Sequence, residues 1–111
     1  MERKLRAYKT YFIDFVNSLK KEEAEKIYYA LDLLKTQNKV SKKFVKYLRE
    51  EIYELRAEYA GNIFRVFFIF DAGNIVVLFH GIKKKTQKTP EKEIKKAIQL
   101  KKEYYAGKQS H

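Results

Sequence analysis

The sequence predicts one α+β domain in which an N-terminal helix hairpin and a C-terminal helix pack on a small antiparallel sheet. Three consecutive segments are rich in β-branched and aromatic residues and are separated by short Gly/Asn turns, as in a meander. Apolar residues at helical spacing occur before and after these segments. Strands grouped together between helices are typical of α+β proteins. Because 111 residues can bury one core but not two, we expect residues 1–111 to form a single domain.

The first forty residues are expected to form the helix hairpin. The segment at residues 3–7 is short and could add an edge strand to the meander. From Tyr8 to Leu19 the apolar residues recur at helical spacing, which predicts a first helix with one buried side. The acidic pair Glu22-Glu23 is typical of a helix N-terminus, and a second apolar pattern continues from there towards Asn38. Neither helix can bury its apolar side alone, so both should lie on the sheet.

The middle of the chain is expected to supply the sheet. Ser41 is placed to cap a short helical turn, after which the strands begin. Along Ile63–Phe70, the second of these strands, apolar side chains alternate onto both faces. We therefore expect this strand to be central and both of its faces to be covered. The predicted helical turn carries Phe44, Val45 and Leu48, and the predicted strands are Ile52–Tyr59, Ile63–Phe70 and Ile75–Ile82.

The last strand leads into a cationic loop and then a helix. Residues 83–88 contain four lysines in six positions. Thr89-Pro90-Glu91 is typical of a helix start, with a capping hydroxyl, a proline at the first helical position and an acid behind it. The apolar side of this helix carries Ile94, Ala97, Ile98 and Tyr105. The polar residues 107–111 should be a frayed terminus.

Charge and composition restrict the class of partner. The net charge is +11, and residues 71–111 contribute +6 of it, from ten Lys and four Asp or Glu. This bias favours a polyanionic partner such as nucleic acid, an acidic protein or an anionic membrane surface. No apolar run reaches the roughly 18 residues of a spanning helix, and residues 1–17 lack the pattern of a signal peptide. With zero cysteines as well, we expect a cytoplasmic protein.

Two arginines interrupt strands that otherwise consist of core residues. A buried guanidinium is costly unless it is paired, so Arg65 requires either a carboxylate partner or an open anion site. The candidate partners are Glu54 and Glu58 on the neighbouring strand. The same two interpretations apply to Arg56. Whether both arginines share a sheet face depends on the register of the hairpin that joins their strands.

Three pieces of the sequence together resemble a known family. YELR at 53–56, GNIFR at 61–65 and HGIKKKTQKTP at 80–90 resemble, in this order and spacing, the phage-derived HigB-like branch of the RelE/ParE toxin superfamily. The resemblance covers nearly the whole chain. It implies a toxin of a bacterial type II toxin–antitoxin system that cleaves mRNA on the ribosome. The implied partners are a helix-turn-helix, HigA-like antitoxin, the ribosome and mRNA, with no membrane.

The resemblance also implies roles for individual residues. The family's chemistry is metal-free attack of a ribose 2′-hydroxyl on the adjacent phosphate, which requires a base, an acid and a charge-stabilising group. Arg65 matches the family's middle-strand arginine, and it is assigned charge stabilisation. Lys84 and Lys85 are the candidate acid or base, since a lysine crowded by other cations can have a lowered pKa. The predicted substrate-binding residues are Arg56, Lys83, Lys88 and His80.

One departure from the family pattern leaves room for other functions. The RelE branch places a tyrosine early in the final helix, where this chain has Ile94. His80 could take that role, although a lone histidine on an apolar strand is more often a hydrogen-bonded core residue. The alternatives are a toxin of the same fold that inhibits another target such as gyrase without cleavage, and a non-catalytic basic nucleic-acid-binding module. No metal-ligand spacing or cofactor motif occurs, so we expect neither a metal nor a cofactor.

Overall fold

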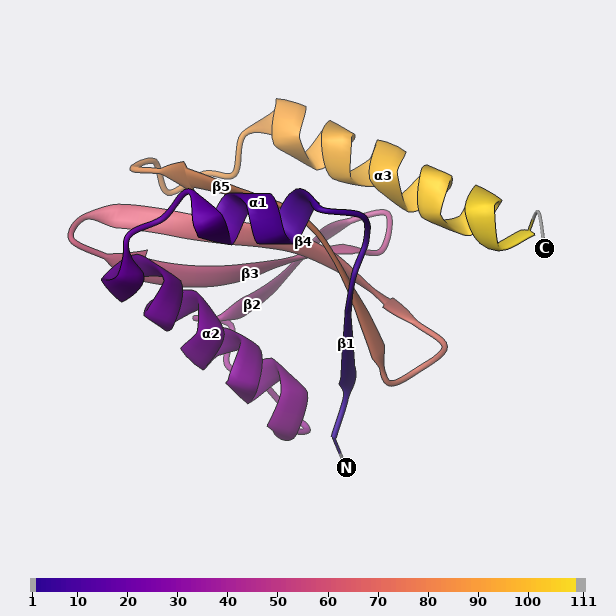
Figure 1. Cartoon of the computed structure of the whole chain (residues 1–111), viewed down its shortest axis with the longest axis horizontal. Helices are drawn as coiled ribbons and strands as arrows, with labels where there is room; N and C mark the ends of the chain where they lie inside the picture. Colours follow the sequence, from indigo (N-terminus) through magenta and orange to yellow (C-terminus); the bar gives the residue numbers. More distant parts are fainter. Residues whose placement is uncertain (1, 110–111) are drawn as a thin grey trace.

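A five-stranded sheet lies between two helical layers in the computed structural model, which describes residues 2–109 (Figure 1). The strand order is β1-β5-β4-β3-β2, with β1 parallel to β5 and all other neighbours antiparallel. No helix in the described part of the chain is both long and apolar enough to cross a membrane. In chain order the elements are β1 (Lys4–Ala7), α1 (Tyr11–Asn17), α2 (Lys21–Thr36), β2 (Val45–Arg49), β3 (Ile52–Tyr59), β4 (Asn62–Asp71), β5 (Ile75–Lys84) and α3 (Glu91–Gln109).

The α+β fold class and the three-stranded meander are confirmed. β3, β4 and β5 match the predicted strands within two residues at each end. The turn between β3 and β4 contains only Ala60 and Gly61, because Tyr59 pairs with Asn62. Both turn residues have positive φ, 53° and 80°, as a two-residue hairpin turn of this type requires. The suggested edge strand at residues 3–7 is also confirmed, since β1 pairs along β5.

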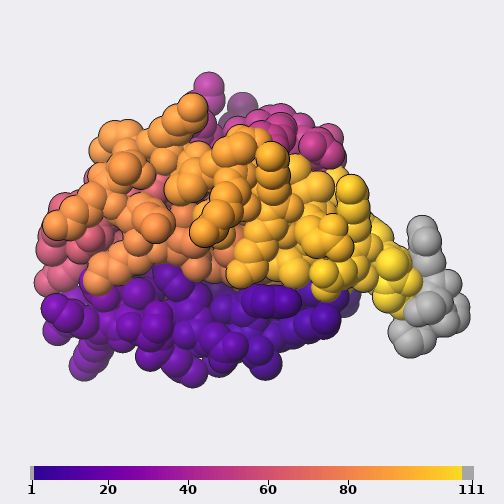
Figure 2. All heavy atoms as spheres, turned by 90° about the horizontal axis from the view of Figure 1, so that it is seen from above, coloured from indigo at the N-terminus to yellow at the C-terminus, as the bar shows by residue number. Residues whose placement is uncertain are grey.

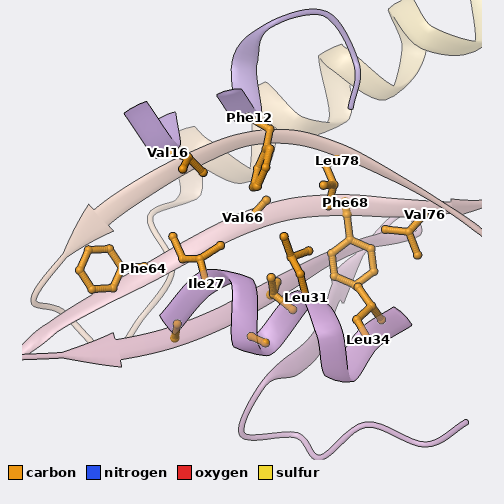
Figure 3. Close-up of a cluster of buried hydrophobic side chains, with 13 residues drawn as sticks. Phe12, Val16, Ile27, Leu31, Leu34, Phe64, Val66, Phe68, Val76 and Leu78 are labelled. Atoms are coloured by element: carbon orange, nitrogen blue, oxygen red, sulfur yellow. The ribbon is translucent and has the colours of Figure 1, made fainter. Parts of the chain in front are cut away.

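Helices α1 and α2 cover one face of the sheet, and α3 covers the other, so β4 is buried on both faces as predicted. On the α1–α2 face, side chains of alternate strand residues meet the two helices in a continuous apolar cluster (Figure 3). The labelled members of this cluster include Phe12, Ile27, Leu31, Phe64, Val66 and Phe68. On the α3 face, the buried residues include Phe67, Ile69, Val77, Phe79, Ala97 and Ile98.

Two predictions about the N-terminal half were wrong. The segment around Val45 forms strand β2 after a single turn at Ser41, because Val45 pairs with Leu55 in the sheet. Tertiary pairing therefore overrides a local pattern that also fitted a helix. The first helix begins at Tyr11 rather than at Tyr8, since the Tyr8 N–H donates to the Leu78 carbonyl and prolongs the β1–β5 ladder.

The C-terminal prediction was only partly testable. Residues 107–109 continue helix α3 instead of fraying, and residues 110–111 lie outside the described part of the chain. The start of α3 also differs from the prediction. Pro90 precedes the helix and its carbonyl accepts from the backbone N–H groups of Glu93 and Ile94. The expected capping hydroxyl of Thr89 instead donates to Glu54 in β3.

We predict that Gly81→Ala destabilises the fold. Gly81 in β5 faces α1, and a Cβ atom at this position would lie 2.2 Å from Cδ2 of Phe15. Moving an aromatic ring in a packed layer typically costs about 1–3 kcal/mol. The matched control is Gly107→Ala in α3, where a Cβ meets nothing within 4 Å and helix propensity favours alanine. Urea unfolding of both variants tests this, and a wild-type midpoint for Gly81→Ala would contradict the packing described.

Candidate functional site

The two arginines of the sheet lie on the same face. The two-residue turn between β3 and β4 places Arg56 directly opposite Arg65 in the antiparallel register. Residues directly opposite each other project to the same side of a sheet. This is the face that α3 covers, and the loop between β5 and α3 runs over it. The sequence did not determine this register. The structure shows that Arg56 and Arg65 share one face of the sheet.

Arg65 is a fully buried cation that binds both a carboxylate and the loop. Its side chain has 0% exposure, and its Nε lies 3.3 Å from Oε1 of Glu54. Its Nη2 donates to the carbonyls of Thr86, at 2.8 Å, and Gln87, at 2.7 Å. Burial lowers the pKa of the Arg65 guanidinium, while the Glu54 carboxylate opposes this shift. The salt-bridge interpretation of Arg65 is confirmed with Glu54 as its partner, and its catalytic role stays a prediction.

Glu54 is the centre of this buried cluster. Besides Arg65, its Oε1 accepts a hydrogen bond of 2.6 Å from the Thr89 hydroxyl, which precedes α3. Its Oε2 lies 3.7 Å from Nε of Arg56. Arg56 is partly buried, and its Nη2 lies 3.4 Å from Oε1 of Gln87 in the loop. One carboxylate of β3 therefore connects two strands, the loop and the start of the final helix.

The two lysines at the end of β5 project to opposite faces of the sheet. Lys83 pairs with Phe64 and Lys84 with Ile63 in the register, so their side chains project to opposite sides. Lys83 Nζ lies 2.8 Å from Oε2 of Glu23 in α2, and this contact holds the pKa of Glu23 below its ordinary value. Lys83 is therefore separated from the loop residues that follow it.

The remaining loop lysines are exposed and unpaired. Lys84, Lys85 and Lys88 make no ion pair with any residue of the described chain. In Figure 2 the loop and α3, orange to yellow, form one continuous surface from which loop side chains project. The loop's backbone is fixed from beneath by Arg65 while these ammonium groups face outward. This arrangement can bind a flexible polyanion without first having to order the loop.

His80 belongs to the core beneath α3. Its side chain is 6% exposed, its ring stacks on Phe67 with centroids 4.7 Å apart, and its Nε2 lies 3.2 Å from Oε1 of Glu93. Burial, reinforced by the positive charge of Lys96, lowers the pKa of His80 to about 4, so the ring is neutral at pH 7. These contacts confirm the hydrogen-bonded core alternative, and a substrate-binding role for His80 stays a prediction.

Sequence reasoning found the cations of this region but missed how they are organised. The sequence indicates Glu54 only as a partner for an arginine, and Thr89 only as a helix cap. Alternation along β3 could have placed Glu54 and Arg56 on one face, since they are two residues apart. The contacts of Gln87 and Thr86 had no signal in the sequence, because they depend on the path of a loop without regular structure.

Comparison with solved structures defines the class of fold. The chain is similar to a chain of the archaeal RelE–RelB complex from Pyrococcus horikoshii OT3, with a TM-score of 0.55 and 15% sequence identity over 79% of this chain and 100% of that one. At this identity the likeness concerns the fold, which is RelE-like. The predicted resemblance to the RelE/ParE superfamily is confirmed at that level, while the HigB-like branch stays a prediction.

The family follows from the sequence itself. Residues 14–102 match the family described as phage derived protein Gp49-like (DUF891), and the chain belongs to this family. No curated protein sequence matches the chain. The matched residues include β2 to β5, most of α3 and the lysine-rich segment at 84–88, which we call the lysine loop.

We predict that His80 makes the fold acid-sensitive. Because the pKa of His80 is about 4 in the folded chain, against an ordinary value of 6.5, the unfolded chain binds a proton more readily. The contribution of neutral His80 to the free energy of unfolding is therefore present above pH 6.5, and it is lost as the pH falls towards 4. By linkage the loss between pH 7 and pH 5 is about 2 kcal/mol. Urea unfolding at both pH values should show this loss in wild type and a smaller one in His80→Gln. Equal losses would contradict the assignment.

Proposed function

We propose that this chain is the toxin of a bacterial type II toxin–antitoxin system and that it cleaves mRNA on the ribosome in the cytoplasm. The Gp49-like family and the RelE-like fold support the toxin class. The proposal that it binds nucleic acid rests on residues 84–88. Three exposed lysines there have no acidic partner among residues 2–109, and the backbone is held by a buried salt bridge. A preformed cationic loop binds phosphates at little cost in conformational entropy.

The proposed reaction is transfer of a phosphoryl group within the RNA strand. The ribose 2′-oxygen forms a bond to the adjacent phosphorus while the bond from phosphorus to the 5′-oxygen breaks, leaving a cyclic phosphate and a 5′-hydroxyl. One group accepts the 2′-proton and another donates a proton to the departing 5′-oxygen. We assign these proton transfers to Lys84 and Lys85, whose side chains are exposed. One of them accepts the 2′-proton as a neutral amine, and the other donates a proton to the 5′-oxygen as an ammonium group.

Charge stabilisation on the phosphoryl oxygens needs accessible cations. Arg56 is partly exposed beside the loop and can reach a phosphate, together with Lys88. Arg65 could contact a phosphate only if the loop moved away from it and the salt bridge between Arg65 and Glu54 broke. In the arrangement described, Arg65 acts by positioning the loop, and His80 acts by supporting α3 through Glu93.

A same-fold toxin that inhibits another target, such as gyrase, without RNA cleavage is the second candidate. One observation favours it: α3 offers no tyrosine near the loop. Ile94 occupies the early position in α3 and is buried. Tyr104 lies more than two turns further along, and its hydroxyl donates to Asp71 at 2.6 Å. A HigA-like antitoxin with an acidic contact surface is the proposed partner in either case.

We expect Lys84→Gln with Lys85→Gln to abolish most RNA cleavage without unfolding the protein. Removing groups that transfer protons should slow cleavage by roughly a hundredfold or more. The matched control is Lys4→Gln with Lys102→Gln, which removes two exposed charges far from the loop. RNA ends are mapped after expression without antitoxin, and thermal unfolding is measured in parallel.

Three results would be informative in different ways. Cleavage by the control but not by the loop variant supports the proposal. Wild-type rates in the loop variant contradict the roles of Lys84 and Lys85. Growth arrest by wild type without any new RNA ends contradicts the nuclease and supports the non-cleaving toxin.

A further inference from the structure

A second cationic feature lies at the edge of the sheet, away from the lysine loop. A groove of about 380 Å³ runs between helix α2 and strand β3. We call it the α2–β3 groove. Its lining combines basic, aromatic and backbone groups, contributed mainly by Lys26, Tyr29, Lys43, Phe44, Arg56 and Glu58.

The floor of the α2–β3 groove is an unpaired strand edge. β2 pairs with β3 only as far as Leu55, and the next outward contact is the Arg56 N–H donating to the Phe44 carbonyl at 2.7 Å. Since outward-facing backbone groups alternate along a strand, the N–H and C=O of Glu58 also point away from β4. No strand covers this edge in the described chain. The groove thus presents a backbone donor and acceptor side by side.

The wall of the α2–β3 groove carries an exposed aromatic ring. Tyr29 is 59% exposed, more than any other large apolar side chain of the described residues. Its ring meets Phe44 edge to face, with centroids 6.0 Å apart, so one side of the ring is supported. Exposed aromatic rings beside cations are the stacking platforms of single-strand-binding proteins.

The charges of the α2–β3 groove favour an anion. Lys26 and Lys43 line it against a single acid, Glu58. Arg56 also lines it, but its guanidinium already lies beside the Glu54 carboxylate. A groove on the other side of α2 provides the contrast. It is lined largely by apolar residues, including Leu5, Phe12, Tyr28 and Leu31, and contains only one cation, Lys35. Aromatic rings line both grooves, but several cations line only the one on the β3 side of α2.

We propose that the α2–β3 groove binds one nucleotide of single-stranded RNA that flanks the cleaved bond. The inference rests on the proposed function and adds a substrate subsite to it. The base stacks on Tyr29, and its edge meets the free backbone groups of Glu58. Lys26 and Lys43 hold the neighbouring phosphates. Arg56 links the two sites, because it lines the groove and also contacts Gln87 of the lysine loop.

Binding of a fluorescent, mixed-sequence single-stranded RNA oligonucleotide tests the proposal. Tyr29→Ala should weaken binding roughly 5- to 100-fold, the usual effect of losing one stacked base. Tyr29→Phe should stay within about twofold of wild type, because the ring is retained. The matched control is Tyr28→Ala, which removes an adjacent tyrosine, 50% exposed, from the other side of α2 and should also bind normally. Equal affinity of Tyr29→Ala and wild type would overturn the proposal.

Further measurements separate this subsite from the proposed nuclease. Photocrosslinking of RNA that carries 4-thiouridine should label Tyr29 or Lys43, and labelling confined to the lysine loop would overturn the subsite. If wild type binds RNA through Tyr29 but generates no RNA ends, the nuclease fails and the subsite stands. If Tyr29→Ala binds RNA normally but loses affinity for the antitoxin, the groove is a protein-docking site and the RNA proposal is wrong.

Discussion

The carboxylate of Glu54 is the interaction on which the candidate site depends. It lies on a central part of the sheet with 1% exposure, and it contacts Arg65, Arg56 and Thr89. Burying the charges of Glu54, Arg65 and Arg56 costs free energy, and this cost is offset only when each charge is paired. Because Arg65 in turn holds two loop carbonyls, the position of the loop follows from this one buried acid.

The final helix is fixed to the sheet at both ends by polar contacts as well as by its apolar side. Near its start, Thr89 binds Glu54 and Glu93 binds His80. Near its end, Asp71 accepts hydrogen bonds from Lys108, at 2.7 Å, and from Tyr104, at 2.6 Å, which lower the pKa of the Asp71 carboxyl. Helix α3 is therefore held against the sheet at both ends.

Local patterns predicted the sheet and its central strand because these depend on composition and alternation. They could not distinguish a strand from a turn at Val45, since its neighbours fit either period and only pairing with Leu55 decides. Arg65 shows the same limit for the site. Its sequence environment allowed a salt bridge or an anion site. The choice depends on the β3–β4 register and on the path of a loop whose contacting residues lie 21 and 22 positions further along the chain. The opposite directions of the Lys83 and Lys84 side chains could have been predicted from alternation, because β5 extends through both residues.

The dependence of the fold on the Glu54–Arg65 pair is tested most directly by the free energy of unfolding of Arg65→Met, determined with urea at pH 7. Methionine fills a similar volume but leaves the Glu54 carboxylate buried without its closest cation. We expect the free energy of unfolding to fall by about 3–5 kcal/mol relative to wild type, as for other broken buried pairs. An unchanged or higher free energy of unfolding would contradict it, because that result is expected of an arginine in an open anion site, repelled by neighbouring lysines and unconnected to the fold.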